Sequence, residues 1–146
     1  EAKQIIDQYF DEFPDVRKYM DLLILKAREN EYVETVFGRR RYLREINSRN
    51  AVMRGAAERN AINAPIQGTA ADIIKIAMIE VDKRLSQKKM KSRMILQIHD
   101  ELIFDMIPEE ENDLRIIVEE SMSQACELEV PLVVDIGVGA NWLEAH

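Results

Sequence analysis

The chain has 146 residues and carries 20 Lys and Arg against 27 Asp and Glu, which gives a formal net charge of −7 at pH 7. This length suits one compact domain. The sequence contains no apolar run long enough to span a membrane and no signal-peptide pattern, so we expect a cytoplasmic protein without a membrane partner. Cys126 is the only cysteine, which excludes an intrachain disulfide and a cysteine-cluster zinc site.

The basic charge is concentrated in one stretch. Residues 38–59 hold seven arginines against two glutamates, a net charge of +5, which leaves −12 for the rest of the chain. Nucleic-acid binding depends on the release of counterions to a basic surface, so this stretch is the candidate for phosphate contacts. The alternative is that these side chains only face solvent. The arginines are Arg39, Arg40, Arg41, Arg44, Arg49, Arg54 and Arg59.

The first half of the chain is predicted to be mostly helical. Apolar residues recur at three- and four-residue spacing through residues 1–30 with a break near Pro14, which predicts a kinked helix or a helix pair. The segment YVETVFGRRRYLREI predicts a β-hairpin with Gly38 in its turn. Residues 50–86 return to the helical pattern, and Pro65 should bend or divide this helix because proline lacks a backbone donor.

The second half predicts the order strand, strand, helix, strand. Strands at about 93–98 and 101–107 form a tight hairpin, a helix follows PEEEN, and PLVVDIGVG alternates as a last strand. The fold class is α+β, a small antiparallel sheet backed by long helices together with an arginine-rich hairpin. We treat the chain as one unit, with helices and the hairpin in residues 1–49 and the sheet-containing portion in residues 50–146.

Three ionisable residues, His99, Asp100 and Glu101, lie at the tip of the second hairpin. The turn lacks the glycine that two-residue turns normally use, so local backbone strain is expected. Carboxylates held on a rigid hairpin suit a hard cation such as Mg²⁺, which takes oxygen ligands. The alternative is an ordinary solvated turn, since Asp is common in turns.

A row of hydrogen-bond donors is predicted on the long helix. Arg59, Asn63 and Gln67 recur every four residues in an alanine-rich region, so they form a stripe about 12 Å long on one helix face. The DNA minor groove presents acceptors on every base pair largely irrespective of sequence, so such a stripe could test base-pair shape. Alternatively, these groups cap a neighbouring loop or face water.

Four segments of the sequence resemble those of bacterial family A DNA polymerases. They are GRRRY, RGAAERNAINAPIQGTAADIIKIAM, QIHDELIFD and GANWLEAH, and they follow the family's order. The resemblance as a whole extends over essentially the whole chain. The resemblance implies a partial palm and fingers of the polymerase domain. It implies template-directed nucleotidyl transfer to a primer 3′-hydroxyl, with primer–template DNA and deoxynucleoside triphosphates as partners.

The resemblance also implies roles for the candidate residues. Asp100 is expected to be a catalytic ligand of two Mg²⁺ ions, Glu101 a supporting carboxylate and His99 a contact to the primer terminus. Contacts to the primer–template duplex are implied for the donor stripe, in agreement with the minor-groove argument. The residues expected to bind DNA are therefore Arg59, Asn63, Gln67 and His99, with Arg39, Arg40 and Arg41 on phosphates.

The family also uses a second catalytic aspartate and a nucleotide-binding fingers helix, and neither pattern occurs in this sequence. We therefore expect a C-terminal fragment of a polymerase domain that is inactive alone and whose exposed sheet edge favours self-association. One alternative is a non-catalytic duplex-binding module. Another is a metal-dependent phosphohydrolase or nuclease built on His99, Asp100 and Glu101; it needs further ligands, and the only other histidine is the terminal His146.

Overall fold

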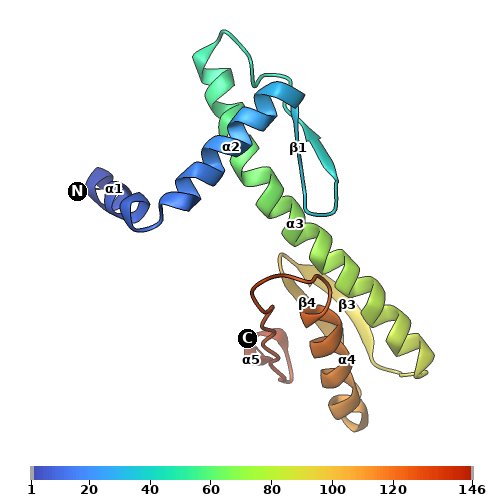
Figure 1. The fold of residues 1–146 in the computed structure, drawn as a ribbon. Helices are drawn as coiled ribbons and strands as arrows, with labels where there is room; N and C mark the ends of the chain where they lie inside the picture. Colours follow the sequence, from blue (N-terminus) through green and yellow to red (C-terminus); the bar gives the residue numbers. More distant parts are fainter. Residues whose placement is uncertain (1, 146) are drawn as a thin grey trace. The chain divides into compact units, whose positions relative to one another are not determined.

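The computed structural model describes residues 2–145, so His146 lies outside the described residues. The chain forms two compact units, Glu1–Thr69 and Ala70–His146. The order of the elements is three helices with a hairpin between the second and third, then a second hairpin and two further helices (Figure 1). Within the described residues no helix is both long and apolar enough to cross a membrane.

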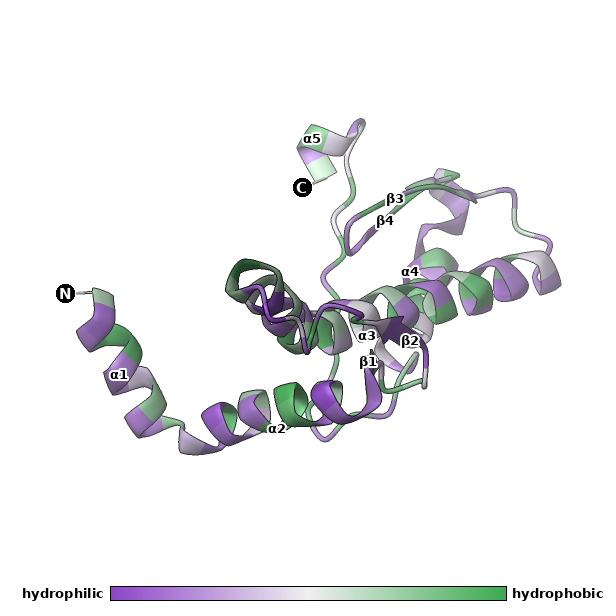
Figure 2. Ribbon diagram, turned by 90° about the horizontal axis from the view of Figure 1, so that it is seen from above, coloured by the Kyte–Doolittle hydropathy of each residue, from purple (hydrophilic) through white to green (hydrophobic). Residues whose placement is uncertain are grey.

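The first unit begins with the predicted helix pair, which is confirmed. Helix α1 spans Ala2–Glu12 and helix α2 spans Pro14–Asn30. Pro14 is the first residue of α2. Proline is tolerated there because the first N–H groups of a helix have no hydrogen-bond partner within the helix. Both helices carry hydrophobic and hydrophilic residues in alternating patches (Figure 2). Helix α1 nevertheless contains no buried residue.

The arginine-rich hairpin is also confirmed. Strand β1 spans Tyr32–Glu34 and pairs antiparallel with β2, Arg40–Tyr42. Gly38 lies in the turn with a φ of 78°, a conformation in which other residues would be strained. The rings of Tyr32 and Tyr42 face each other across the strands with centroids 5.8 Å apart.

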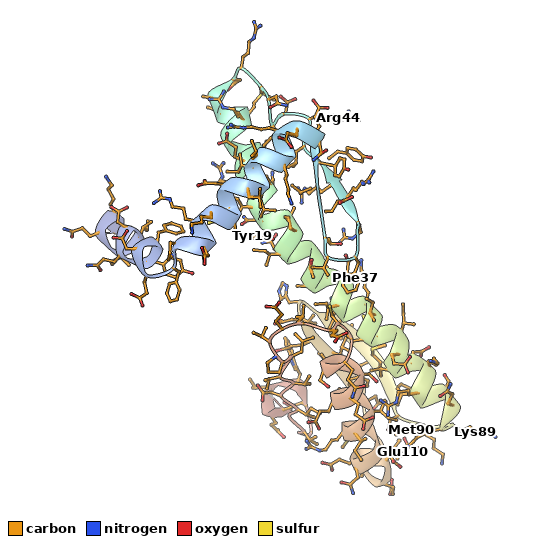
Figure 3. All side chains as sticks on the ribbon, in the orientation of Figure 1. Tyr19, Phe37, Arg44, Lys89, Met90 and Glu110 are labelled. Atoms are coloured by element: carbon orange, nitrogen blue, oxygen red, sulfur yellow. The ribbon has the colours of Figure 1, made fainter. Side chains whose placement is uncertain are left out.

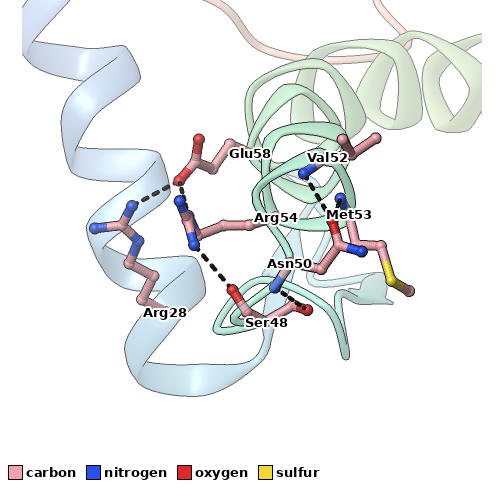
Figure 4. Close-up of polar contacts among 7 residues, drawn as sticks. All are labelled: Arg28, Ser48, Asn50, Val52, Met53, Arg54 and Glu58. Carbon is pink, nitrogen blue, oxygen red and sulfur yellow. Dashed lines mark hydrogen bonds and ion pairs between the residues drawn. The ribbon is translucent and has the colours of Figure 1, made fainter.

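Helix α3 spans Ala51–Gln87 and contributes to both units. Its first turn is capped by Asn50, whose Oδ1 accepts hydrogen bonds from the backbone N–H of Val52 at 3.0 Å and of Met53 at 3.5 Å (Figure 4). Pro65 lies inside the helix and does not divide it. The core of the first unit packs small residues of α3 against α2 and the hairpin, and consists of Ala27, Val33, Leu43, Ile46, Ala57, Ala61 and Ala64.

The second unit contains the predicted carboxylate-bearing hairpin. Strand β3, Arg93–Ile98, pairs antiparallel with β4, Glu101–Asp105, and Ile98 lies opposite Glu101, so the turn has two residues. The 3₁₀ turn η1, Pro108–Glu110, leads into α4, Glu111–Ser123, and a short helix α5 spans Trp142–Ala145. The core of this unit contains Val81, Leu85, Leu114, Ile117 and Val118.

The predicted last strand at 131–139 is wrong. Its alternation is present, since Leu132, Val134 and Ile136 are half-buried while the residues between them are exposed. A strand also needs a hydrogen-bonded neighbour, and in residues 2–145 β3 and β4 pair only with each other. The segment is therefore an extended chain attached through side chains, with Ile136 packed against the core of the second unit.

Glu110 joins the start of β3 to the segment after β4. Its carboxylate accepts hydrogen bonds from the backbone N–H of Lys91 at 2.9 Å and of Ser92 at 2.8 Å, and from the Ser92 hydroxyl at 2.7 Å. The Ser92 Oγ in turn accepts from the N–H of Ile107 at 3.0 Å. Figure 3 shows Glu110 beside the loop that carries Lys89 and Met90. The bonds from Lys91 and then Ser92 lower the pKa of Glu110 below its ordinary value of 4.5.

We expect this carboxylate to make the second unit sensitive to acid. Because the pKa of Glu110 is lower in the folded state, its contribution to stability is present above pH 4.5 and is lost as the pH falls through the folded-state pKa. Replacing Glu110 by Gln should flatten the fall in unfolding free energy on the acid side of pH 4.5, measured by urea unfolding at a series of pH values. The matched control is Glu109→Gln, at an exposed neighbour. Equal slopes for Glu110→Gln and the wild type would contradict this role.

Candidate nucleic-acid interface and carboxylate hairpin

The donor stripe is exposed along the first part of α3. Arg59, Asn63 and Gln67 all face solvent, whereas the opposite face of the helix buries Ala57, Ala61 and Ala64. Throughout the described residues none of the three stripe side chains makes a hydrogen bond or an ion pair. They do not cap a neighbouring loop, so their donors are available to a ligand that presents acceptors at a spacing of about 6 Å.

The three consecutive arginines of the first hairpin have different surroundings. Arg40 donates a hydrogen bond to the Glu34 carboxylate at 2.7 Å, and its guanidinium lies over the ring of Tyr32, 4.4 Å from the ring centroid. The bond to Glu34 raises the pKa of Arg40 above its ordinary value. Arg39 donates from Nη2 to the carbonyl oxygen of Gly68 on α3 at 3.0 Å. Arg41 is exposed.

Among the remaining arginines of the basic stretch, Arg54 is held inside the unit. It donates from Nη1 to the carbonyl oxygen of Ser48 at 3.0 Å and lies 3.9 Å from Glu58, which also pairs with Arg28 at 2.6 Å (Figure 4). Four exposed arginines have no ion pair in the part of the chain that the structure describes, and these form what we call the free arginine set: Arg41, Arg44, Arg49 and Arg59.

The expected strain in the carboxylate hairpin is confirmed at His99. Its φ of 54° lies in the left-handed region, which costs a non-glycine residue about 1 kcal/mol. The Gln97 side-chain amide donates to the carbonyl oxygen of His99 at 2.8 Å and so supports this conformation. His99 and Asp100 are exposed at the turn, and Glu101 is half-buried at the start of β4.

The hairpin carries two adjacent carboxylates, Asp100 at the turn and Glu101 at the start of β4. Across residues 2–145, no three His, Cys, Asp or Glu side chains converge on a point that could hold a metal ion. Mg²⁺ prefers about six oxygen ligands, of which one or two are usually carboxylates and several are water or substrate. Asp100 and Glu101 therefore suit such an ion as a partial ligand set that needs oxygens from elsewhere.

Sequence reasoning missed the contact between the first hairpin and α3. The N–H of Val36 donates to the Thr69 Oγ1 at 3.1 Å, and the same hydroxyl donates to the carbonyl oxygen of Pro65 at 2.6 Å. Gly68 lies at the centre of this contact. One signal was available, because glycine inside a helix costs about 1 kcal/mol relative to alanine and so suggests a close backbone approach.

Comparison with known proteins gives sequence matches over nearly the whole chain. The family model for DNA polymerase family A matches residues 1–144. The DNA polymerase I of Lactococcus lactis subsp. cremoris is 48% identical over 145 residues, and that of Mycobacterium tuberculosis is 50% identical over 142 residues. These alignments include 99% and 97% of the chain, respectively. The chain belongs to DNA polymerase family A.

A solved structure gives the same result for the fold. The polymerase domain of Pol1 from M. smegmatis, in complex with DNA primer–template and dNTP, matches with a TM-score of 0.97 and 50% identity. The match includes 99% of this chain and 26% of that chain. The chain spans 16% of the length of the relatives from L. lactis and M. tuberculosis.

Proposed function

We propose that this chain is the part of a DNA-directed DNA polymerase that holds the primer–template duplex and contributes Asp100 to the catalytic centre. The observation that carries the proposal is the match along 99% of the chain, at a TM-score of 0.97, to a polymerase domain solved with primer–template DNA and dNTP. The proposed reaction of the whole protein is attack of a primer 3′-hydroxyl on a deoxynucleoside triphosphate, which lengthens the primer by one nucleotide.

Two groups of residues are suited to hold the duplex. The donors of Arg59, Asn63 and Gln67 match the acceptors of the minor groove, purine N3 and pyrimidine O2, which occur on every base pair. A donor row that finds these acceptors in place accepts any correct pair and loses hydrogen bonds at a mispair. The members of the free arginine set outside the donor stripe, Arg41, Arg44 and Arg49, supply sequence-independent phosphate contacts.

The carboxylate hairpin is suited to the reacting end of the primer. Asp100, with Glu101 beside it, would hold divalent cations, taken here as two Mg²⁺ ions, together with ligands from elsewhere in the protein. When bound, such ions favour deprotonation of the attacking hydroxyl and neutralise charge on the leaving pyrophosphate. Gln97 and the strand pairing of Ile98 with Glu101 fix the turn that presents Asp100. His99 would contact the primer terminus from the same turn.

A nuclease or phosphohydrolase that uses the same residues is less well supported. Either centre would need ligands beyond His99, Asp100 and Glu101, but the family model and the matching solved structure are those of a polymerase. The two activities give opposite products on an end-labelled primer in the presence of Mg²⁺ and all four deoxynucleotides. The full-length protein should lengthen the primer, and shortening alone would favour the nuclease.

Gln67 should affect mismatched primers more than matched ones. In the full-length polymerase, Gln67→Ala removes one donor worth about 0.5–1.5 kcal/mol, so we expect extension from a mismatched terminus to fall roughly two- to tenfold. Extension from a matched terminus should fall less, because the remaining donors find their acceptors. The measurement is single-nucleotide extension on primers that differ only in the terminal pair.

The matched control for Gln67 is Gln87→Ala, which removes an exposed amide from the last residue of the same helix, about 30 Å along it from Gln67 and on a different face. This variant should behave as the wild type on both primers. If Gln67→Ala slows matched and mismatched primers by the same factor, the stripe does not read the minor groove.

A further inference from the structure

Gly68 leaves space on α3 for the loop of the arginine-rich hairpin. A Cβ atom added at Gly68 would lie 2.7 Å from the Thr35 Cγ2 and 3.3 Å from the Arg39 Nη2. The first of these distances is too short for two non-bonded carbon atoms, so alanine could not be accommodated unless Thr35 moved. Thr35 is itself buried, with 8% of its surface exposed. The hairpin therefore packs directly on the helix backbone at this point.

Hydrogen bonds fix the hairpin in one register on the helix. The Thr69 hydroxyl donates to the carbonyl oxygen of Pro65 and accepts from the N–H of Val36. The hydroxyl therefore acts as donor and acceptor at once, and its orientation is fixed. The Arg39 guanidinium donates to the Gly68 carbonyl oxygen, and the Arg39 N–H donates to the Thr35 Oγ1 at 3.2 Å. A shift of the hairpin by one residue would break the two hydrogen bonds that cross to α3, from Val36 to Thr69 and from Arg39 to Gly68. Figure 3 shows the turn at Phe37 beside α3.

This contact connects the two groups that the proposed function assigns to DNA. Gln67, the last member of the donor stripe, directly precedes Gly68 in the sequence and is exposed. Arg41 lies on β2 opposite Val33, two positions after Arg39, and is exposed as well. The packing residues themselves do not belong to the donor stripe or the free arginine set.

We propose that Gly68, Thr69 and Thr35 are positioning residues, which hold the arginine hairpin at a fixed register to the donor stripe so that the same duplex is contacted at its phosphates and in its minor groove. This inference rests on the proposed function. It identifies these three residues as determinants of DNA affinity although none of them needs to touch DNA. Loss of the register would separate the phosphate contacts from the groove contacts.

The test uses the full-length polymerase and the salt dependence of its binding to primer–template DNA. Gly68→Ala should lower the salt slope by about 1 for each phosphate contact that is lost. Each contact contributes a slope of about 0.9 in the plot of log K against log salt concentration, which is a factor of about eight between ~1 M and ~0.1 M salt. Affinity at ~0.1 M salt should therefore fall roughly eightfold for each contact that is lost. Alanine is the better helix former, so the loss cannot come from the helix itself.

Two further variants separate positioning from general destabilisation. Thr35→Ser removes the methyl group that a Cβ at Gly68 would meet and keeps the hydroxyl, so the double variant Gly68→Ala with Thr35→Ser should recover the wild-type slope. Gly55→Ala is the matched control on the same helix, because a Cβ there meets only the Arg59 Nη1, at 3.8 Å. It should bind DNA as the wild type does.

The inference is overturned if folded Gly68→Ala binds with the wild-type slope, or if the double variant does not recover it. Should Gly68→Ala fail to fold, Thr69→Val removes the bridging hydroxyl at similar volume and should give the same reduced slope; an unchanged slope would overturn the inference. Failure of the proposed function looks different, because the wild type itself would then neither extend primers nor bind the duplex in a salt-dependent way.

Discussion

Replacing Asp100 by Asn in the full-length polymerase should reduce nucleotide incorporation by about 1,000-fold or more while duplex affinity stays near the wild-type value. The substitution keeps the shape of the side chain and removes the charge that would hold divalent cations. Metal-ion stabilisation of a transition state is worth several kcal/mol, and each 1.36 kcal/mol corresponds to a factor of ten in rate. Single-turnover incorporation and a separate DNA-binding titration measure the two effects.

The matched control is Asp105→Asn, which removes an exposed carboxylate from the other end of β4 on the same hairpin. This variant should incorporate nucleotides at close to the wild-type rate. Incorporation by Asp100→Asn within a few-fold of the wild type would remove Asp100 from the catalytic centre. A parallel loss of DNA affinity would assign it to binding instead.

The 146-residue chain by itself should incorporate no nucleotide when it is supplied with primer–template DNA, Mg²⁺ and all four deoxynucleotides. In residues 2–145 no three potential ligands converge, and in-line attack needs both the attacking and the leaving oxygen to be held in place. The measurement is primer extension with the purified chain, with the full-length polymerase as the positive control. Template-directed extension that copurifies with the chain would show that its own residues complete the catalytic centre.

Local sequence signals were sufficient for most of the fold. Pro14 and Gly38 mark a helix start and a turn through constraints on φ that act within one or two residues. The segment at 131–139 shows where such signals end, because its alternation is real and its half-buried residues do pack inward. Strand formation depends on a partner, and the pattern of one segment contains no information about whether a neighbour is present.

The candidate site was predictable to the extent that it depends on helical spacing. The exposure of Arg59, Asn63 and Gln67 follows from their four-residue repeat opposite a row of buried alanines. The different surroundings of Arg39, Arg40 and Arg41 could not be predicted, because they depend on Glu34 and Tyr32 across the hairpin and on a carbonyl of α3. These three arginines are identical and adjacent in the sequence, and their surroundings differ only because other parts of the fold contact them differently.

A salt series tests whether this chain binds duplex DNA through its free arginines outside the donor stripe, Arg41, Arg44 and Arg49. The 146-residue chain is titrated with blunt duplex DNA from low to physiological salt. We expect weak binding, limited by the charge of −12 outside residues 38–59, with a plot of log K against log salt concentration that has a slope of about −3 for three phosphate contacts. A folded chain that shows no binding at low salt, or binding that does not change with salt, would show that these arginines do not contact DNA phosphates.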